Sequence, residues 1–371
     1  MRILLNGILR LLILLFFVRF SSYSVEIITI AGTGSHGASD YGMGQFSLPG
    51  GVFSGNDGSL FVLDTYNNLI RRISPDGDVS PFAGNIQMHR GEPILDMFNF
   101  PRGGFEDGLL ANALFNRPSG GVVTPDGVIY IADSGNHAIR RIVDGRVSTF
   151  VYESGLLYYP TAVAIDPQGN LVVADTGNNV IRRIDISGNV TTVAGVPGQY
   201  GYNNGPGHTA LFNEPMGIAI NSHGDIIVAD SGNHLIRVIR NGEVTTLAGI
   251  YQLPEEEDDF EPWDMMPLGG FLDGSPNEAM FNLPVGLALW NDIIFVADSV
   301  NHAIRAILPD GWVTTISGSG YPGHVDGAVH EAAFHMPRGV YVLDYDLIIV
   351  DTGNNMIRRT LFEEVYDYDD V

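Results

Sequence analysis

The stretch Asp230-Ser-Gly-Asn-His-Leu-Ile-Arg237 decides the fold, because close copies of it recur along the chain. The other copies begin at Asp64, Asp133, Asp175, Asp298 and Asp351, and each ends in an arginine seven residues later. A unit repeated at intervals of several tens of residues is the signature of a repeat architecture. The spacing between successive aspartates is uneven, so the connecting loops vary in length while the unit stays constant.

Each unit contains four short β-strand signals separated by turn residues. In the third unit, apolar and β-branched residues fill segments 161–166, 171–174, 180–185 and 190–194, and Gly, Asn and Pro separate them. Four-stranded antiparallel units repeated in this way form the blades of a β-propeller. The sixth unit ends after its third strand, and the missing fourth copy lies at 27–32. The sequence therefore predicts an all-β, six-bladed β-propeller whose N-terminal strand pairs into the last blade and closes the ring.

The motif resembles the NHL repeat family, which is named for the residues seen here as Asn233-His234-Leu235. The resemblance covers residues 25–362 and implies six NHL blades. That family includes binding platforms as well as enzymes, so the resemblance specifies the fold more sharply than the activity.

The two ends of the chain differ from the propeller. Residues 1–24 have two early arginines, an apolar run at 11–18 and small residues before Val25, which is the layout of a secretory signal peptide, with an uncleaved anchor as the alternative. Residues 363–371 form an acidic tail. We therefore expect a secreted or otherwise exported propeller of residues 25–362, with membrane anchoring only if the signal is retained and no stable insertion once it is cleaved.

The composition bears on partners. The chain has 371 residues and a net charge of −24, and it contains no cysteine. An acidic surface repels phosphate backbones, so we expect no nucleic-acid binding, whereas protein and carbohydrate partners are compatible with it.

The longest connections run from one blade to the next, over residues 84–118 and 249–284. They join blades one to two and four to five, so they should face each other across the channel on the face that also carries the turns between second and third strands. Long loops held by a rigid scaffold commonly carry function. The candidate contact residues in the second loop are Glu255, Glu256, Glu257, Asp258, Asp259 and Trp263.

The position four residues after each repeated aspartate is always Asn or His. Around the ring it is occupied by Asn68, His137, Asn179, His234, His302 and Asn355. These side chains should form a ring at the channel mouth, and His137, His234 and His302 are the candidate metal ligands because three histidines suit zinc. The alternative is a polar ring that satisfies backbone groups of the turns.

Two enzyme families with six blades are relevant to this ring. In the peptidylglycine amidating lyases, which resemble this chain, zinc histidines from alternate blades occupy the corresponding place. His137 and His234 match that pattern, and Asn355 stands in the third position. Lactonases and gluconolactonases resemble the fold too and hold calcium in the channel with Glu, Asn and Asp. No cofactor is expected, and a divalent Zn or Ca ion is the alternative.

The repeated aspartates and arginines are present in every unit, which indicates a structural role. The pairs are Asp64 with Arg71, Asp133 with Arg140, Asp175 with Arg182, Asp230 with Arg237, Asp298 with Arg305, and Asp351 with Arg358. No catalytic residue is assigned. The function predicted from the sequence is a non-catalytic binding platform for a protein or carbohydrate, and the alternative is a metal-dependent lyase or hydrolase that uses the ring.

Overall fold

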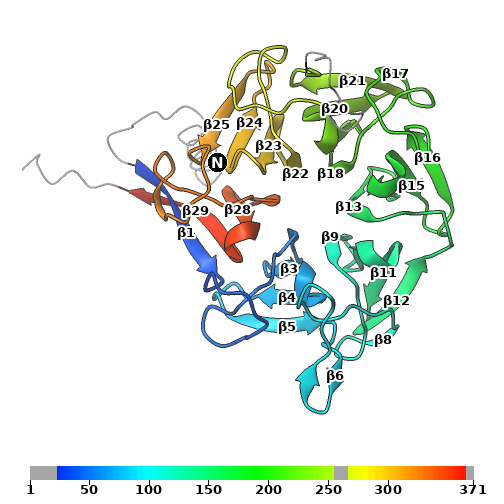
Figure 1. The fold of residues 1–371 in the computed structure, drawn as a ribbon, viewed down its shortest axis with the longest axis vertical. Helices are drawn as coiled ribbons and strands as arrows, with labels where there is room; N and C mark the ends of the chain where they lie inside the picture. Colours follow the sequence, from blue (N-terminus) through cyan, green and yellow to red (C-terminus); the bar gives the residue numbers. More distant parts are fainter. Residues whose placement is uncertain (1–22, 255–265, 365–371) are drawn as a thin grey trace, which may run out of the picture.

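The computed structural model describes residues 23–254 and 266–364. Its strands form six antiparallel sheets arranged around a central channel (Figure 1). The all-β, six-bladed propeller predicted from the repeats is confirmed. The strand boundaries in the third blade agree with the sequence prediction to within a residue, because alternating apolar residues and turn glycines mark them clearly.

Each blade contains four strands in meander order, with the first strand innermost. Blade 1 contains β2 (Gly51–Ser54), β3 (Leu60–Asp64), β4 (Leu69–Ile73) and β5 (Val79–Ala83), and blade 2 contains β9 (Pro118–Val123), β10 (Ile129–Asp133), β11 (Ala138–Val143) and β12 (Arg146–Val151). Blade 3 contains β13 (Pro160–Ile165), β14 (Leu171–Asp175), β15 (Val180–Ile184) and β16 (Val190–Ala194), and blade 4 contains β18 (Pro215–Ile220), β19 (Ile226–Asp230), β20 (Leu235–Arg240) and β21 (Glu243–Ala248). Blade 5 contains β22 (Pro284–Trp290), β23 (Ile293–Asp298), β24 (Ala303–Ile307) and β25 (Val313–Ser317).

Blade 6 combines the two ends of the described chain. Its inner strands are β27 (Gly339–Leu343) and β28 (Asp346–Asp351), followed by β29 (Met356–Glu364). β1 (Tyr23–Ala31) completes the blade by pairing antiparallel with β29, from Tyr23 opposite Glu364 to Ala31 opposite Ile357. The first and last strands therefore close the ring, as predicted, and β29 lies inside the sheet between β28 and β1.

Three blades carry a fifth, very short outer strand that the sequence did not predict. These strands are β8 (Gly108–Leu109), β17 (Gly205–Pro206) and β26 (Gly327–Ala328). Each belongs to the connection that enters its blade, so the chain first lies along the outer edge and then crosses to the inner strand. The long connection between blades 1 and 2 contains a further hairpin of β6 (Met88–His89) and β7 (Glu92–Pro93).

The hydrophobic core consists of clusters between neighbouring blades. At five junctions a fully buried phenylalanine from the entering connection fills the cluster, and at the junction of blades 2 and 3 Leu157 takes its place. The phenylalanines are Phe46, Phe115, Phe212, Phe281 and Phe334. Burial of a side chain of this size contributes about 1.5–3 kcal/mol, so these residues help to lock each blade onto the next.

Glycines bring the inner strands close together around the channel. A Cβ atom on Gly217 would lie 1.9 Å from the carbonyl oxygen of Val285, and one on Gly120 would lie 2.5 Å from that of Thr161. Only glycine permits backbones to approach this closely. The channel is therefore narrow and lined by backbone at these positions.

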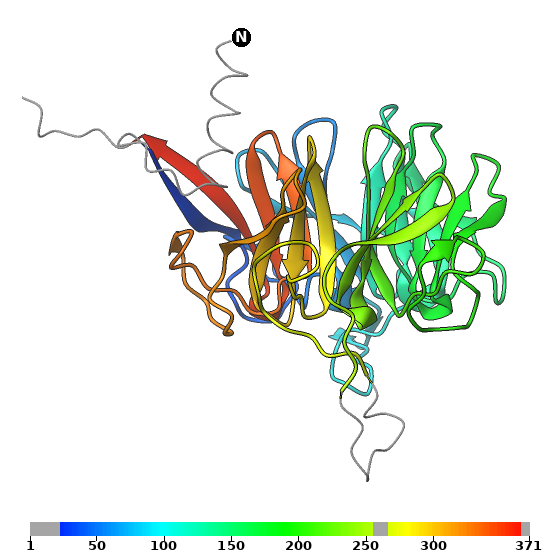
Figure 2. The same cartoon turned by 90° about the horizontal axis from the view of Figure 1, so that it is seen from above.

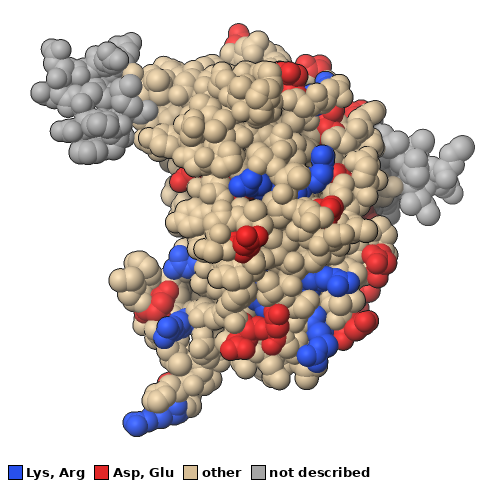
Figure 3. Space-filling model, turned by 90° about the vertical axis from the view of Figure 1, so that its right-hand side faces the viewer, with Lys and Arg blue, Asp and Glu red and all other residues tan. Residues whose placement is uncertain are grey.

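The two long inter-blade loops project from the same face of the ring on opposite sides of the channel (Figures 1 and 2). On the side of the molecule shown in Figure 3, acidic and basic side chains are interspersed and do not gather into a patch of one sign. None of the described residues forms a helix that is long and apolar enough to cross a membrane.

Candidate functional site

Each repeated aspartate holds together the turn that follows it. Asp230 accepts hydrogen bonds from the Asn213 N–H at 2.8 Å, from Asn233 Nδ2 at 2.8 Å and from an Arg237 Nη at 2.6 Å. Burial raises the pKa of Asp230 to about 6, while Arg237 and the other hydrogen bonds act in the opposite direction. The same aspartate–arginine ion pair is present in the other five blades.

The repeated arginines also bind the connection that enters their blade. Arg140 forms a second ion pair with Asp107 at 2.7 Å, and Arg305 forms one with Asp273 at 2.6 Å. In blade 4 the neutral Asn204 replaces this second carboxylate, with its Oδ1 at 2.8 Å from Arg237. The guanidinium groups of five of the arginines also lie over the buried phenylalanines. These contacts account for the repetition of the aspartates and arginines in every blade by packing alone.

The six Asn and His residues predicted to form a ring lie at successive blade junctions. Each occupies a left-handed backbone conformation, and its side chain accepts a hydrogen bond from the backbone N–H of the residue before the proline that opens the next blade. The pairs are Asn68 with Arg117, His137 with Tyr159, Asn179 with Glu214, His234 with Leu283, His302 with Met336, and Asn355 with Leu48. The structure therefore distributes these residues as links between blades.

A hydroxyl of the same motif adds a second link at most junctions. In five blades the Ser or Thr that follows the repeated aspartate donates a hydrogen bond to the carbonyl of the next blade's proline. Thr65 bonds Pro118 at 2.8 Å, for example, and Ser231 bonds Pro284 at 2.6 Å. At the junction of blades 5 and 6, the buried Ser299 hydroxyl has no partner among the described residues.

The three candidate metal ligands do not fit a shared metal ion. His137, His234 and His302 all accept a backbone N–H through Nδ1, which leaves the proton of the neutral ring on Nε2 and no lone pair for a metal. His234 also donates from Nε2 to the Pro267 carbonyl at 3.0 Å. Within the described residues, no three His, Asp or Glu side chains lie together in a metal-binding group.

Burial lowers the pKa of both His234 and His302, and for His302 the neighbouring His335 acts in the same direction. Their rings are therefore held neutral more strongly than a free imidazole, as their linking role requires. The other candidate contacts, Glu255 to Asp259 and Trp263, lie outside the described residues.

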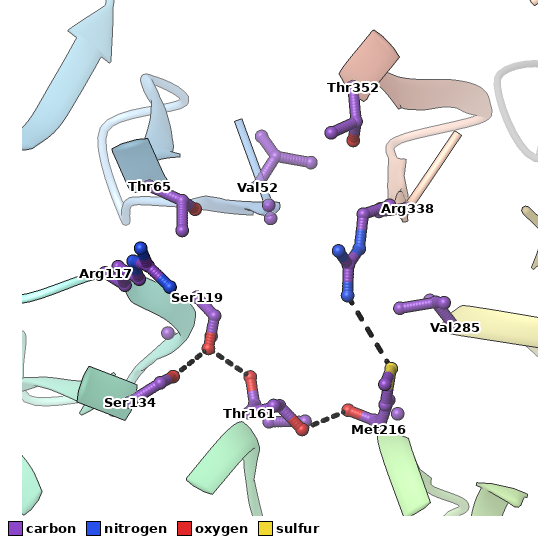
Figure 4. Close-up of a pocket in the computed structure, with 18 of the residues that line it drawn as sticks. Val52, Thr65, Arg117, Ser119, Ser134, Thr161, Met216, Val285, Arg338 and Thr352 are labelled. Carbon is purple, nitrogen blue, oxygen red and sulfur yellow. Dashed lines mark hydrogen bonds between the residues drawn. The ribbon is translucent and has the colours of Figure 1, made fainter. Parts of the chain in front are cut away.

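A cavity of about 330 Å³ occupies the channel between the inner strands (Figure 4). Its wall is built largely from the residues on either side of the six blade-opening prolines. The residues after the prolines are Gly50, Ser119, Thr161, Met216, Val285 and Arg338, and all six line the cavity. Of the residues before the prolines, Leu48, Arg117, Tyr159 and Met336 line it as well.

The two cavity-lining arginines lie on either side of the cavity (Figure 4). Arg117 approaches Asp96 at 3.7 Å and lies over the Tyr66 ring. The Arg338 guanidinium donates a hydrogen bond to Met216 Sδ at 3.6 Å, and among the described residues no carboxylate lies within ion-pairing distance of it. Burial lowers the pKa of Arg338, but a guanidinium remains protonated at neutral pH.

A second cavity, of about 570 Å³, opens beneath the loop that joins blades 1 and 2. Tyr66, Arg117 and Tyr159 line both cavities, so the two share a border at the channel mouth. Phe100, Pro101 and His137 complete part of its wall. This cavity therefore lies between the loop that joins blades 1 and 2 and the channel mouth.

Sequence reasoning missed the residues that flank the prolines. The sequence prediction rested on the motif positions that recur in every blade, and in the structure those positions link one blade to the next. The flanking residues differ from blade to blade, and a site for one ligand in a six-fold scaffold has to break the symmetry. The signal was present in the sequence, since Arg338 is the single charged residue among the six that follow the prolines.

Comparisons with known proteins agree with this architecture. The NHL repeat family model matches residues 115–142, 157–184 and 212–239. The chain is 28% identical over 280 residues to the Arabidopsis thaliana protein SUPPRESSOR OF QUENCHING 1, chloroplastic. This alignment covers 69% of this chain and 26% of that protein. It is also 28% identical over 307 residues to human NHL repeat-containing protein 2, covering 70% of this chain and 40% of that protein.

Among solved structures, an auxiliary nutrient binding protein from Bacteroides thetaiotaomicron superposes with a TM-score of 0.66 at 15% identity, covering 92% of this chain and 77% of that chain. This likeness concerns the fold alone. The chain spans between 26% and 40% of the length of the two curated relatives.

Blades, closure and inter-blade links together define a six-bladed β-propeller built from six copies of one motif. The chain contains NHL repeats: the NHL family model matches three of its blades, and human NHL repeat-containing protein 2 aligns over 70% of the chain.

Proposed function

We propose that this protein is a non-catalytic binding platform that engages a protein or carbohydrate partner on the face carrying the two long inter-blade loops. One observation carries the proposal: both loops expose large apolar side chains on that face, on opposite sides of the channel. From the first loop these are Met88, Met97 and Phe98, and from the second Leu253, Met266 and Leu268.

Met97 is 89% exposed and Phe98 64% exposed, and they lie next to each other in the chain. Exposed groups of large apolar side chains mark interaction surfaces in soluble proteins. Methionine and aromatic residues are enriched in the centres of protein interfaces, so the loop tips favour a protein over a carbohydrate. The structural neighbour described as a nutrient binding protein is compatible with a binding role for this fold.

The test replaces the exposed apolar groups on each face in turn. Met97→Ser with Phe98→Ser changes the proposed face. Ile186→Ser with Trp312→Ser, at turns between third and fourth strands, removes a comparable apolar surface from the opposite face, where the side chains are 82% and 48% exposed.

The purified full-length protein and both variants are probed on a glycan array and by cross-linking to proteins of the source organism's exported fraction. We expect saturable binding of one partner that the loop variant loses and the control variant retains. Equal loss in both variants, or loss in the control alone, would refute the proposed face.

Export also belongs to this proposal, on the strength of the sequence pattern of residues 1–24. The mass of the protein recovered from the exported fraction measures it. A mature chain that begins at Val25 supports export with cleavage, and a mass that includes the apolar run at 11–18 contradicts cleavage.

A further inference from the structure

We propose that the channel cavity binds a small organic carboxylate, whose carboxylate group pairs with Arg338 and whose apolar part packs on Met216 and Val285. The inference goes beyond the proposed function, because it assigns a small-molecule ligand to the channel in addition to the partner on the loop face. It is carried by the residues that line the cavity.

The charge of the cavity wall is opposite to that of the protein as a whole. The protein has 43 acidic residues, yet among the described residues no aspartate or glutamate lines this cavity, whereas two arginines do. Each of the six repeated arginines has a carboxylate partner. Buried or partly buried cations are normally paired. Arg338 is partly buried and departs from that pattern, so its guanidinium is available to an anion that enters the channel.

The serine and threonine hydroxyl groups in the wall are already hydrogen-bonded within the protein. The Ser119 hydroxyl bonds Ser134 and the Thr161 carbonyl, and the Thr161 hydroxyl bonds Thr176 and the Met216 carbonyl. Among the described residues, the Arg338 guanidinium donates a hydrogen bond only to the Met216 thioether, which is a weak acceptor, so most of its five N–H donors can bind a ligand.

The balance of charge and apolar surface indicates the kind of anion. Asp96 lies 3.7 Å from Arg117 and offsets its charge, which leaves about one net positive charge at the cavity and matches a monoanion. A planar guanidinium suits a carboxylate because two parallel hydrogen bonds can form. Met216 and Val285 lie beside Arg338 in Figure 4, and the apolar residues Val52, Ile218 and Leu287 also line the cavity. The volume, about 330 Å³, falls within the range of small-molecule sites.

Isothermal titration calorimetry on the full-length protein tests the assignment with butyrate, hexanoate, glucuronate and inorganic phosphate as probes. We expect saturable binding of the alkyl carboxylates, weaker binding of glucuronate because its hydroxyls meet an apolar wall, and none of phosphate. Arg338→Gln should weaken carboxylate binding roughly 10- to 100-fold, the value of hydrogen bonds to a charged group. Arg338→Lys should restore only part of it, because the bidentate geometry is lost.

Arg146→Gln is the matched control, since it removes the same charge from an exposed position at the start of β12. Its affinity should equal that of the wild type. Absence of carboxylate binding to the wild type, tighter binding of phosphate, or equal affinity in wild type and Arg338→Gln would each overturn the assignment. The Met97→Ser and Phe98→Ser variant should retain carboxylate binding, so a failure of the loop proposal is distinguishable from a failure of the channel site.

Discussion

At the scale of single residues, the NHL motif separates into positions that hold the ring and positions that are free to differ. The aspartate bonds its own turn and arginine, the hydroxyl and the Asn or His bond the next blade, and the arginine bonds the entering connection. The identity of these residues could be predicted from their repetition. The direction of the Asn and His side chains could not, because it depends on the backbone of the next blade.

The structural role of the repeated aspartates can be tested by comparing two buried ion pairs that differ in the second partner of the arginine. Asp230→Asn leaves the Arg237 guanidinium without any carboxylate, because its second partner is Asn204. Asp298→Asn leaves Arg305 with Asp273. We expect Asp230→Asn to lower the free energy of unfolding by about 3–5 kcal/mol and Asp298→Asn by clearly less. Urea unfolding measures both, with Asp57→Asn, from an exposed pair, as a control that should cost under about 1 kcal/mol. Equal losses in the two buried pairs would contradict a stabilising role for the second carboxylate.

Arg338 should contribute little to the stability of the fold, in contrast to the residues of the buried ion pairs. Because it has no carboxylate partner among the described residues, Arg338→Gln should change the free energy of unfolding by no more than about 0.5 kcal/mol. Arg305→Gln leaves the carboxylates of Asp273 and Asp298 without their ion-pair partner, so it should be strongly destabilising. Thermal unfolding of the two variants side by side checks this. A large loss of stability in Arg338→Gln would indicate that the residue is structural.

The blade link through His234 predicts a pH dependence. Burial lowers the pKa of His234, so below the ordinary histidine pKa of about 6.5 the unfolded chain binds more protons than the folded chain, and stability falls as the pH falls. His234→Asn keeps a hydrogen-bond acceptor, as in blades 1, 3 and 6. It should match the wild type at pH 7.5 to within about 1 kcal/mol and lose less stability at pH 5. Chemical denaturation at the two pH values tests this, and an identical pH dependence in both proteins would count against a buried neutral ring.

At the scale of elements, the sequence predicted the four-stranded blades well because alternation and turn residues mark each strand. It missed the short strands β8, β17 and β26, since two residues that pair with an outer edge leave no periodic pattern. The conformation of the long loops also escaped prediction, because their contacts are made with neighbouring blades and not within the segment.

The closure of the ring by β1 can be tested with substitutions at two neighbouring residues of that strand. Ile27 is fully buried in the cluster between blades 5 and 6, whereas the next residue, Ile28, points to the other side of the strand and is partly exposed. Ile27→Ala should cost about 2–5 kcal/mol and Ile28→Ala distinctly less. Equilibrium unfolding of both variants measures the difference. Similar costs would mean that β1 does not pair with β29 in the register that turns Ile27 into the core.

At the scale of the whole molecule, six similar blades create a stiff frame, and function has to arise where the six differ. The differences gather at the channel mouth, in the residues around the blade-opening prolines and in two loops of unequal sequence. The fold and the faces could be predicted from the sequence. The cavity could not, because its lining is contributed one or two residues at a time by all six blades.

The measurement that tests the channel site most directly is a crystal structure of the protein with its tightest-binding carboxylate. We expect the carboxylate within hydrogen-bonding distance of Arg338 inside the channel, with the Nδ1 bonds of His137, His234 and His302 unchanged. A ligand held by those histidines with their links to the next blade broken, or a ligand bound outside the channel, would contradict both the ligand site and the linking role of the ring.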